Sequence, residues 1–193
     1  MFFRSFGARI FGEIGYDRGM KEIFTIGHST RDIEDFLALL KAHGIEEVVD
    51  VRTIPKSRHN PQYGQELLAA SLKEAGLAYS HMGRLGGLRR TSKESPNTGW
   101  QNTSFRGFAD YMATEPFREG LEELEALAEK KRVAIMCAEA VPWRCHRSLI
   151  ADALVTRGWQ VRHIQSRKTA KAHELTPFLK VQDGKMVYPE PFE

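Results

Sequence analysis

The sequence predicts an α/β fold: a three-layer sandwich built on a mostly parallel sheet of about five strands, followed by a C-terminal hairpin. Short apolar runs alternate with amphipathic segments along the chain, which is the order expected of strand–helix units. The strand candidates are apolar almost throughout, as parallel strands covered on both faces are. Asp183-Gly184 lies between two alternating runs and predicts the hairpin.

The chain has the length and composition of one globular domain, with 193 residues, a hydrophobic fraction of 41% and a charged fraction of 27%. We expect residues 1–20 to be an N-terminal extension that is partly disordered, residues 21–169 to form the domain, and residues 170–193 to be a tail packing on it. No apolar stretch approaches the roughly 18 residues of a membrane span, and the N-terminal apolar run is too short for a secretory signal. Two cysteines do not make a disulfide framework. We therefore expect a cytoplasmic protein with no membrane partner.

The first half of the chain predicts three strands and two helices. The strands are expected at 21–27, 47–52 and 77–82, and the helices between 29 and 44 and at 65–75. Ser29 or Thr30 is expected to cap the first helix, with Asp32 completing a capping box. Gly44 and Gly76 are expected to end the two helices.

The second half begins with a loop over 83–104, a length that is typical of functional or disordered segments. Helices are expected at 105–112 and 116–130, followed by a strand at 133–137 and a helix that ends at Gly158. A strand at 160–164 and a short helix at 173–179 are expected after it. Pro116 suits the first turn of its helix.

Reactive side chains gather where the predicted strands end. Both cysteines of the chain, Cys137 and Cys145, flank a turn that leads from a buried strand into a helix. Ligands of open parallel sheets bind outside the carboxyl ends of the strands, where the sequence also places His28 and the pair Asp50 and Arg52. Alternation along a strand puts Asp50 beside Arg52, and likewise Cys137 beside Glu139.

Each of these groups has a structural alternative. Cys145 lies near a helix N-terminus between cationic neighbours, which favours a thiolate nucleophile, but it could equally pack as a small apolar residue. Cys137 belongs to a buried strand, where cysteine is common as a hydrophobe. Glu139 suits general acid–base work or an ion pair with Arg52 or Arg147.

Spacing argues against two familiar kinds of site. The eight-residue step from Cys137 to Cys145, with His146 adjacent, does not match the usual pairing of structural zinc ligands. A phosphatase-like loop fails as well, because arginine follows Cys137 one position too late, at Arg144. We therefore assign no metal ligand, and the sequence identifies no cofactor.

Two basic regions predict an anionic partner. Residues 52–106 hold 9 Lys/Arg against 3 Asp/Glu, and residues 144–173 hold 7 against 1, although the whole chain carries only +3. Basic and aromatic side chains alternate in the loops, as in proteins that bind nucleotides or nucleic acid. Solvated basic faces would give the same counts.

Four separated motifs resemble the domain of unknown function 488 family. They are Thr25-Ile26-Gly27-His28-Ser29, Asp50-Val51-Arg52 with Pro55 and Ser57, Leu85-Gly86-Gly87, and Cys137-Ala138-Glu139 with Pro142 and Cys145-His146-Arg147. The resemblance covers about 21–164 and implies a single cytosolic α/β domain of prokaryotic type, without a settled reaction.

These observations predict an enzyme acting on a phosphate-bearing or nucleotide-like substrate at the strand ends. The catalytic candidates are Cys137, Glu139, Cys145, His28 and Asp50. The candidates for binding the anion are Ser29, Arg52, Ser57, Arg58, Gly86, Gly87, Arg89, His146 and Arg147. A nucleic-acid-binding module without chemistry and a thiol redox or metal sensor are the alternatives.

Overall fold

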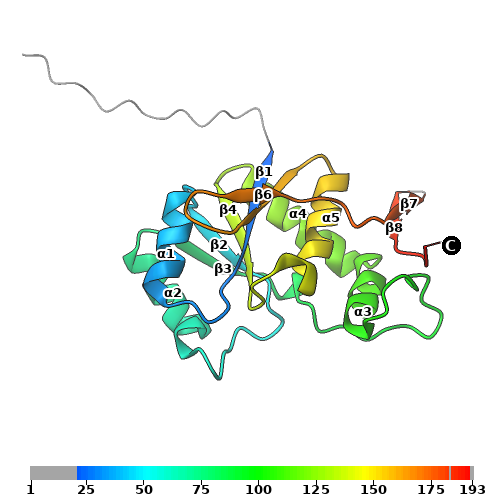
Figure 1. Cartoon of the computed structure of the whole chain (residues 1–193), viewed down its shortest axis with the longest axis horizontal. Coiled ribbons are helices and arrows are strands. Elements are labelled where there is room, and N and C mark those ends of the chain that lie inside the picture. Colours follow the sequence, from blue (N-terminus) through cyan, green and yellow to red (C-terminus); the bar gives the residue numbers. More distant parts are fainter. Residues whose placement is uncertain (1–20, 183, 192–193) are drawn as a thin grey trace, which may run out of the picture.

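Six strands lie side by side between two layers of helices in the computed structural model, which describes residues 21–182 and 184–191 (Figure 1). The strands of this sheet are β1 (Glu22–Gly27), β2 (Glu47–Asp50), β3 (Ala78–His81), β4 (Val133–Cys137), β5 (Gln160–Ile164) and β6 (Ala170–Ala172). The helices are α1 (Ile33–Ala42), α2 (Gln65–Glu74), α3 (Thr103–Met112), α4 (Glu115–Ala128) and α5 (Arg147–Thr156), with 3₁₀ turns η1 (Pro61–Tyr63), η2 (Gly83–Leu85) and η3 (Pro142–Arg144). Strands β7 (Lys180–Gln182) and β8 (Lys185–Val187) form a separate hairpin.

The strand order is β3-β2-β4-β1-β5-β6, and only the edge strand β6 is antiparallel to its neighbour. The predicted α/β class, the mostly parallel sheet and the C-terminal hairpin are therefore confirmed. The expected extension over 1–20 and Asp183 of the hairpin turn lie outside the described residues.

The two faces of the sheet are divided by the alternation of side chains along each strand. In β4, Ala134 and Met136 join the apolar cluster of α1 and α2, whereas Ile135 and Cys137 join the cluster beneath α3, α4 and α5. Figure 1 shows α1 and α2 on one side of the strands and α3, α4 and α5 on the other. Cys137 thus ends its strand on the side that α5 covers.

Two expectations for the helices were wrong. Helix α1 begins at Ile33 after Asp32, whose side chain makes no cap bond, while Ser29 takes a left-handed φ of 51° and its amide bonds the carbonyl of Ala138. Ser29 therefore belongs to the sheet edge and not to the helix start.

Residues 173–179 form no helix. The amide of His173 continues the pairing with β5 through the carbonyl of Val161, and the amide of Thr176 donates to the Asp152 carboxylate. Pro177 also disfavours helical backbone at the residue before it. The preceding strand, β6, was missed because three residues, Ala170–Ala172, are too few to show alternation.

The helices within the described part of the chain include none that is both long enough and apolar enough to cross a membrane.

Candidate active site

The register of the sheet brings the ends of β1, β2 and β4 together. Gly27 lies opposite Cys137, and Asp50 lies opposite Met136. Pairing continues beyond β1, because the amide of His28 donates to the carbonyl of Cys137 at 3.0 Å. Residues 28, 52 and 137–139 therefore share one edge of the sheet, as the strand ends predicted.

Gly27 permits this close approach. A Cβ at this position would overlap the backbone carbonyl of Glu139 and reach within 3.0 Å of the Cα of Ala140. Backbone atoms cannot move aside as the end of a flexible side chain can. Gly27 thus lets the loop after β4 cross the end of β1.

Asp50 and Arg52 form a buried ion pair. The Nε of Arg52 donates to both carboxylate oxygens at 2.8 and 3.1 Å, and its Nη2 donates to Oδ2 at 2.5 Å and to the carbonyl of Tyr63 at 2.8 Å. The Tyr79 hydroxyl also donates to Asp50, at 3.0 Å. Burial and the Asp50 charge raise the pKa of Tyr79 above its ordinary value, which keeps this hydroxyl a donor.

His28 lies beside this pair with a defined tautomer. Its Nδ1 is 2.7 Å from the carbonyl of Ser29, which can only accept, so Nδ1 carries the proton. The ring stacks on Tyr63 at 4.1 Å, and Nε2 lies 3.5 Å from Nη1 of Arg52. Burial lowers the pKa of His28, so the ring stays neutral next to the guanidinium.

Cys137, Cys145 and His146 form a compact centre. The Nδ1 of His146 is 3.9 Å from Sγ of Cys137 and 3.7 Å from Sγ of Cys145, and the three atoms all lie within 4.8 Å of one another. The Nε2 of His146 is 3.1 Å from the carbonyl of Val51, so Nε2 carries the proton. In the neutral ring the Nδ1 lone pair faces both sulfur atoms, and in the protonated ring Nδ1 donates to a thiolate.

The two thiols have opposite acidities. A hydrogen bond from the Cys145 thiol lowers the pKa of Cys137 well below its ordinary value, and His146 and Arg147 add to the effect against the cost of burial. The same hydrogen bond, together with burial, raises the pKa of Cys145. The pair therefore holds one proton more readily than two or none.

Gly86 and Gly87 press their loop against this centre. A Cβ at Gly87 would lie 2.5 Å from Nδ1 of His146, and one at Gly86 would lie 2.8 Å from the Cα of Thr53. On its other side the His146 ring meets Phe108 edge-on at 5.0 Å. The imidazole is thus held between the glycine loop and α3.

Arg147 fastens the loop and does not face the site. It is only 1% exposed, and its guanidinium donates to the carbonyls of Glu139 at 2.5 Å and Ala140 at 2.9 Å. In the first turn of α5 the amides of Ser148 and Leu149 are occupied as well, because they donate to the carbonyls of Cys145 and His146. These two amides and the Nη atoms of Arg147 are therefore already engaged and do not hold an anion at this edge.

A cavity of about 380 Å³ opens beside the centre. It is lined by Arg52, Thr53, Ile54, Lys56, Gly87, Leu88, Ser104, Phe105, Cys137, Ala138, Glu139, Arg144, Cys145 and His146. Glu139 is exposed and, among the described residues, its carboxylate forms no ion pair. Of the expected partners, Arg52 pairs with Asp50, and Arg147 donates to the backbone carbonyl of Glu139 and not to its carboxylate. Cys137 and Glu139 do share the cavity, as their spacing predicted.

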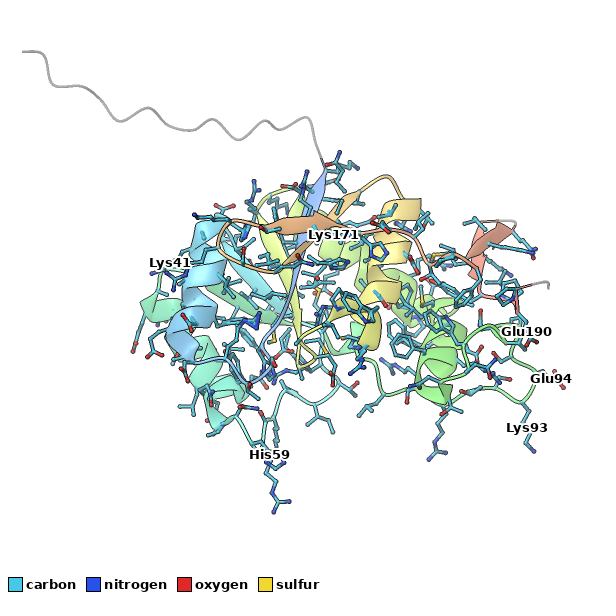
Figure 2. All side chains as sticks on the ribbon, viewed as in Figure 1. Lys41, His59, Lys93, Glu94, Lys171 and Glu190 are labelled. Atoms are coloured by element: carbon cyan, nitrogen blue, oxygen red, sulfur yellow. The ribbon has the colours of Figure 1, made fainter. Side chains whose placement is uncertain are left out.

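Several predicted binding residues have other contacts. Ser57 accepts the amide of Asn60 within its own loop, and Arg58 is exposed without lining the cavity. Arg89 donates to the carbonyls of Gly83, Arg84 and Gly86 and lies over the Tyr111 ring at 3.7 Å. The neighbouring His59 projects outward from the same loop as Arg58 (Figure 2).

Lys56, Leu88 and Thr53 line the cavity although the sequence did not mark them. The signal that could have identified them is position, because Lys56 and Thr53 follow Arg52 closely and Leu88 follows the Gly86-Gly87 pair. Lysine, leucine and threonine are common in loops, so residue type alone does not mark these positions.

Comparisons with known proteins give one match. No curated protein matches the chain, and no solved structure does. The family model described as Domain of unknown function DUF488 matches residues 32–154, more than half of the chain, and this span includes Asp50, Arg52 and the Cys137–Cys145–His146 centre. The chain belongs to the DUF488 family.

Proposed function

We propose that the protein is an enzyme acting on a phosphate-bearing, nucleotide-like substrate, with its chemistry at the Cys137–Cys145–His146 centre. The observation that carries this proposal is the cavity of about 380 Å³, which joins the centre to Arg144 and Lys56. Reactive groups and cations that line one cavity are what a catalytic site requires.

The charges of the lining favour an anion. Lys56 and Arg144 are exposed at the cavity, whereas the charge of Arg52 is already matched by Asp50. Among the described residues, Glu139 is the one carboxylate of the lining. Two cations against one carboxylate attract a phosphate group, and arginine can bind it through two parallel hydrogen bonds.

Aromatic side chains next to the cavity favour a nucleotide over a simple phosphate. A neighbouring hollow of about 470 Å³ shares Phe105, Glu139 and Arg144 with the cavity and adds Trp100, Asn102 and Trp143. Trp143 is 67% exposed, an unusual position for a side chain of its size. A base stacked on Trp143 would leave its phosphate close to the neighbouring Arg144.

The centre offers the groups for bond making and proton transfer. The two thiols face the unprotonated Nδ1 of His146, which can accept a proton from either one. Glu139 is the accessible carboxylate for acid–base work on a leaving group.

The proposal is tested by titrating the protein with a panel of nucleotides, sugar phosphates and their dephosphorylated counterparts, and by assaying turnover of the compounds that bind. We expect K56A/R144A to weaken the best ligand by at least about tenfold, a loss of about 1.4 kcal/mol. Cys137→Ser should retain binding and lose turnover. R118A is the matched control, because Arg118 is exposed on α4 and pairs with Glu115.

Binding that does not distinguish phosphorylated from dephosphorylated compounds would contradict the proposal. So would binding of equal strength in the double variant and in R118A.

The adjacent thiols also favour a second candidate, a thiol redox or metal sensor. Both sulfur atoms lie at one cavity wall with an imidazole lone pair between them. Such a protein would respond to oxidants or metal ions without turning over any compound of the panel.

A further inference from the structure

The Cys137–Cys145–His146 centre has the shape of a metal site. We propose that it binds one zinc ion through both sulfur atoms and the Nδ1 of His146, with the fourth coordination position open to the cavity. The inference deepens the proposed function, since it rests on the same site and gives that site its cofactor.

The distances within the centre fit a tetrahedral ion. Zinc bonds of about 2.3 Å to sulfur and about 2.0–2.1 Å to nitrogen place S and N about 3.6 Å apart in a tetrahedron. The observed separations from Nδ1 are 3.9 Å to Cys137 and 3.7 Å to Cys145. Shifts of a few tenths of an ångström would bring these two separations to the tetrahedral value. The two sulfur atoms, which lie within 4.8 Å of each other, would move to about 3.8 Å.

The tautomer of His146 is already the one that a metal needs. The carbonyl of Val51 accepts the proton of Nε2 at 3.1 Å, so the Nδ1 lone pair is available. Metal-bound histidines are commonly oriented by a hydrogen bond of this kind from the other ring nitrogen. The close approach of Gly87 and the edge contact with Phe108 fix the plane of the ring.

The ligand types select the metal and its use. Two thiolates balance the charge of a divalent ion, and thiolate with imidazole favours zinc over calcium or magnesium. Two cysteines and one histidine leave one position for water or substrate, the pattern of catalytic zinc sites and not of closed structural ones. All three ligands line the cavity, so this position faces the proposed substrate.

The spacing argument against zinc does not apply to this centre, for a geometric reason. Short ligand spacings describe sites in which one tight turn carries both cysteines. Here Cys137 ends β4 and Cys145 lies two residues before the start of α5, and Arg147 holds the carbonyls of Glu139 and Ala140 in the loop between them. A seven-residue excursion therefore returns the second cysteine to the first.

The test measures binding of Zn²⁺ to the reduced, metal-stripped full chain against a chromophoric chelator. We expect one equivalent per chain, and Co²⁺ in its place should show sulfur-to-metal charge transfer and the visible bands of a tetrahedral ion. C137S, C145S and H146N should each lose more than about 100-fold in affinity, beyond what changes around a ligand cause. H59N is the matched control, because His59 is exposed on a loop outside the cavity.

A second measurement needs no variant and so does not depend on how the variants fold. Zn²⁺ should protect both cysteines of the wild-type protein from alkylation, with protection saturating at one equivalent. Alkylation at the same rate with and without Zn²⁺ would overturn the inference. So would an affinity for Zn²⁺ that is the same in C137S and C145S as in the control H59N.

The outcomes separate the inference from the proposed function. If the protein binds one equivalent of zinc but none of the compounds of the phosphate panel, the zinc site is supported and the proposed substrate class is rejected. The opposite result is turnover of a panel compound at full rate by metal-stripped protein, together with cysteines that Zn²⁺ does not protect. This result supports the proposed substrate class and rejects the zinc site.

Discussion

At the scale of single residues, the Asp50–Arg52 ion pair is the interaction whose loss should lower the free energy of unfolding most clearly. The Asp50 side chain is fully buried and that of Arg52 is 6% exposed. Asp50→Asn would leave the guanidinium buried without its counter-charge, and removing one partner of a buried pair costs about 3–5 kcal/mol. Urea unfolding should show this loss as a lower midpoint with an unchanged slope.

Asp35→Asn provides the matched comparison. Asp35 pairs with Arg167 at 3.2 Å, but both side chains are about two-thirds exposed, and exposed pairs contribute about 0–1 kcal/mol. Equal losses of stability in the two variants would show that burial does not set the strength of the Asp50–Arg52 pair.

The arginines show where residue-scale reasoning from sequence ends. Alternation correctly placed Arg52 beside Asp50, because that inference needs only the period of a strand. Arg89 and Arg147 were expected to bind an anion, yet each donates to backbone carbonyls of a nearby loop. Sequence gives the charge of a guanidinium, but the position of the carbonyls around it depends on the folded loop.

At the scale of elements, a buried hydrogen-bond chain joins β1, β5, α5 and the segment after β6. Thr25 donates to Nδ1 of His163 at 2.7 Å, Nε2 of His163 donates to Nδ1 of His173 at 2.9 Å, and Nε2 of His173 donates to Asp152 at 2.8 Å. Asp152 also accepts the Tyr188 hydroxyl at 3.0 Å. The direction of donation follows from the carboxylate, which can only accept.

This chain predicts a pH-dependent stability. Burial, with the neighbouring His173, lowers the pKa of His163 from 6.5 to about 3. Because the folded pKa lies below the unfolded one, the contribution of His163 is fully present above about pH 6.5 and is lost as the pH falls toward 3. Between these limits the unfolded state binds the extra proton, at up to about 1.4 kcal/mol per pH unit.

The measurement is the free energy of unfolding from pH 7 to pH 5 for the wild type and His163→Asn. The variant should show a shallower decline, by roughly one proton, even where its stability at pH 7 is lower. Parallel curves would mean that His163 accepts its proton as readily in the folded protein as in the unfolded chain. His59→Asn, at an exposed position, should keep the wild-type slope.

At the scale of the whole molecule, the sequence predicted more of the fold than of the site. Apolar runs and helix-ending glycines, such as Gly44 and Gly76 with their positive φ, are local signals that the structure reproduces. Strand order is not local, and neither is the return of Cys145 to Cys137. Contacts between residues far apart along the chain depend on how the loops close, and a single sequence does not record this.

The distribution of charge over the molecule separates an enzyme with an anionic substrate from a nucleic-acid-binding module. Residues 52–106 hold 9 Lys/Arg, but partners within the fold already occupy Arg52, Arg84, Arg89 and Arg106. If only Lys56 and Arg144 meet phosphates, the logarithm of the affinity for a single-stranded oligonucleotide should change with the logarithm of salt concentration by about −1.4. A surface that uses all nine Lys/Arg of residues 52–106 would give a slope of about −6. Fluorescence anisotropy at several salt concentrations distinguishes the two, and K56A/R144A should bring the smaller slope close to zero. A steep slope that survives this double variant would favour the nucleic-acid-binding module.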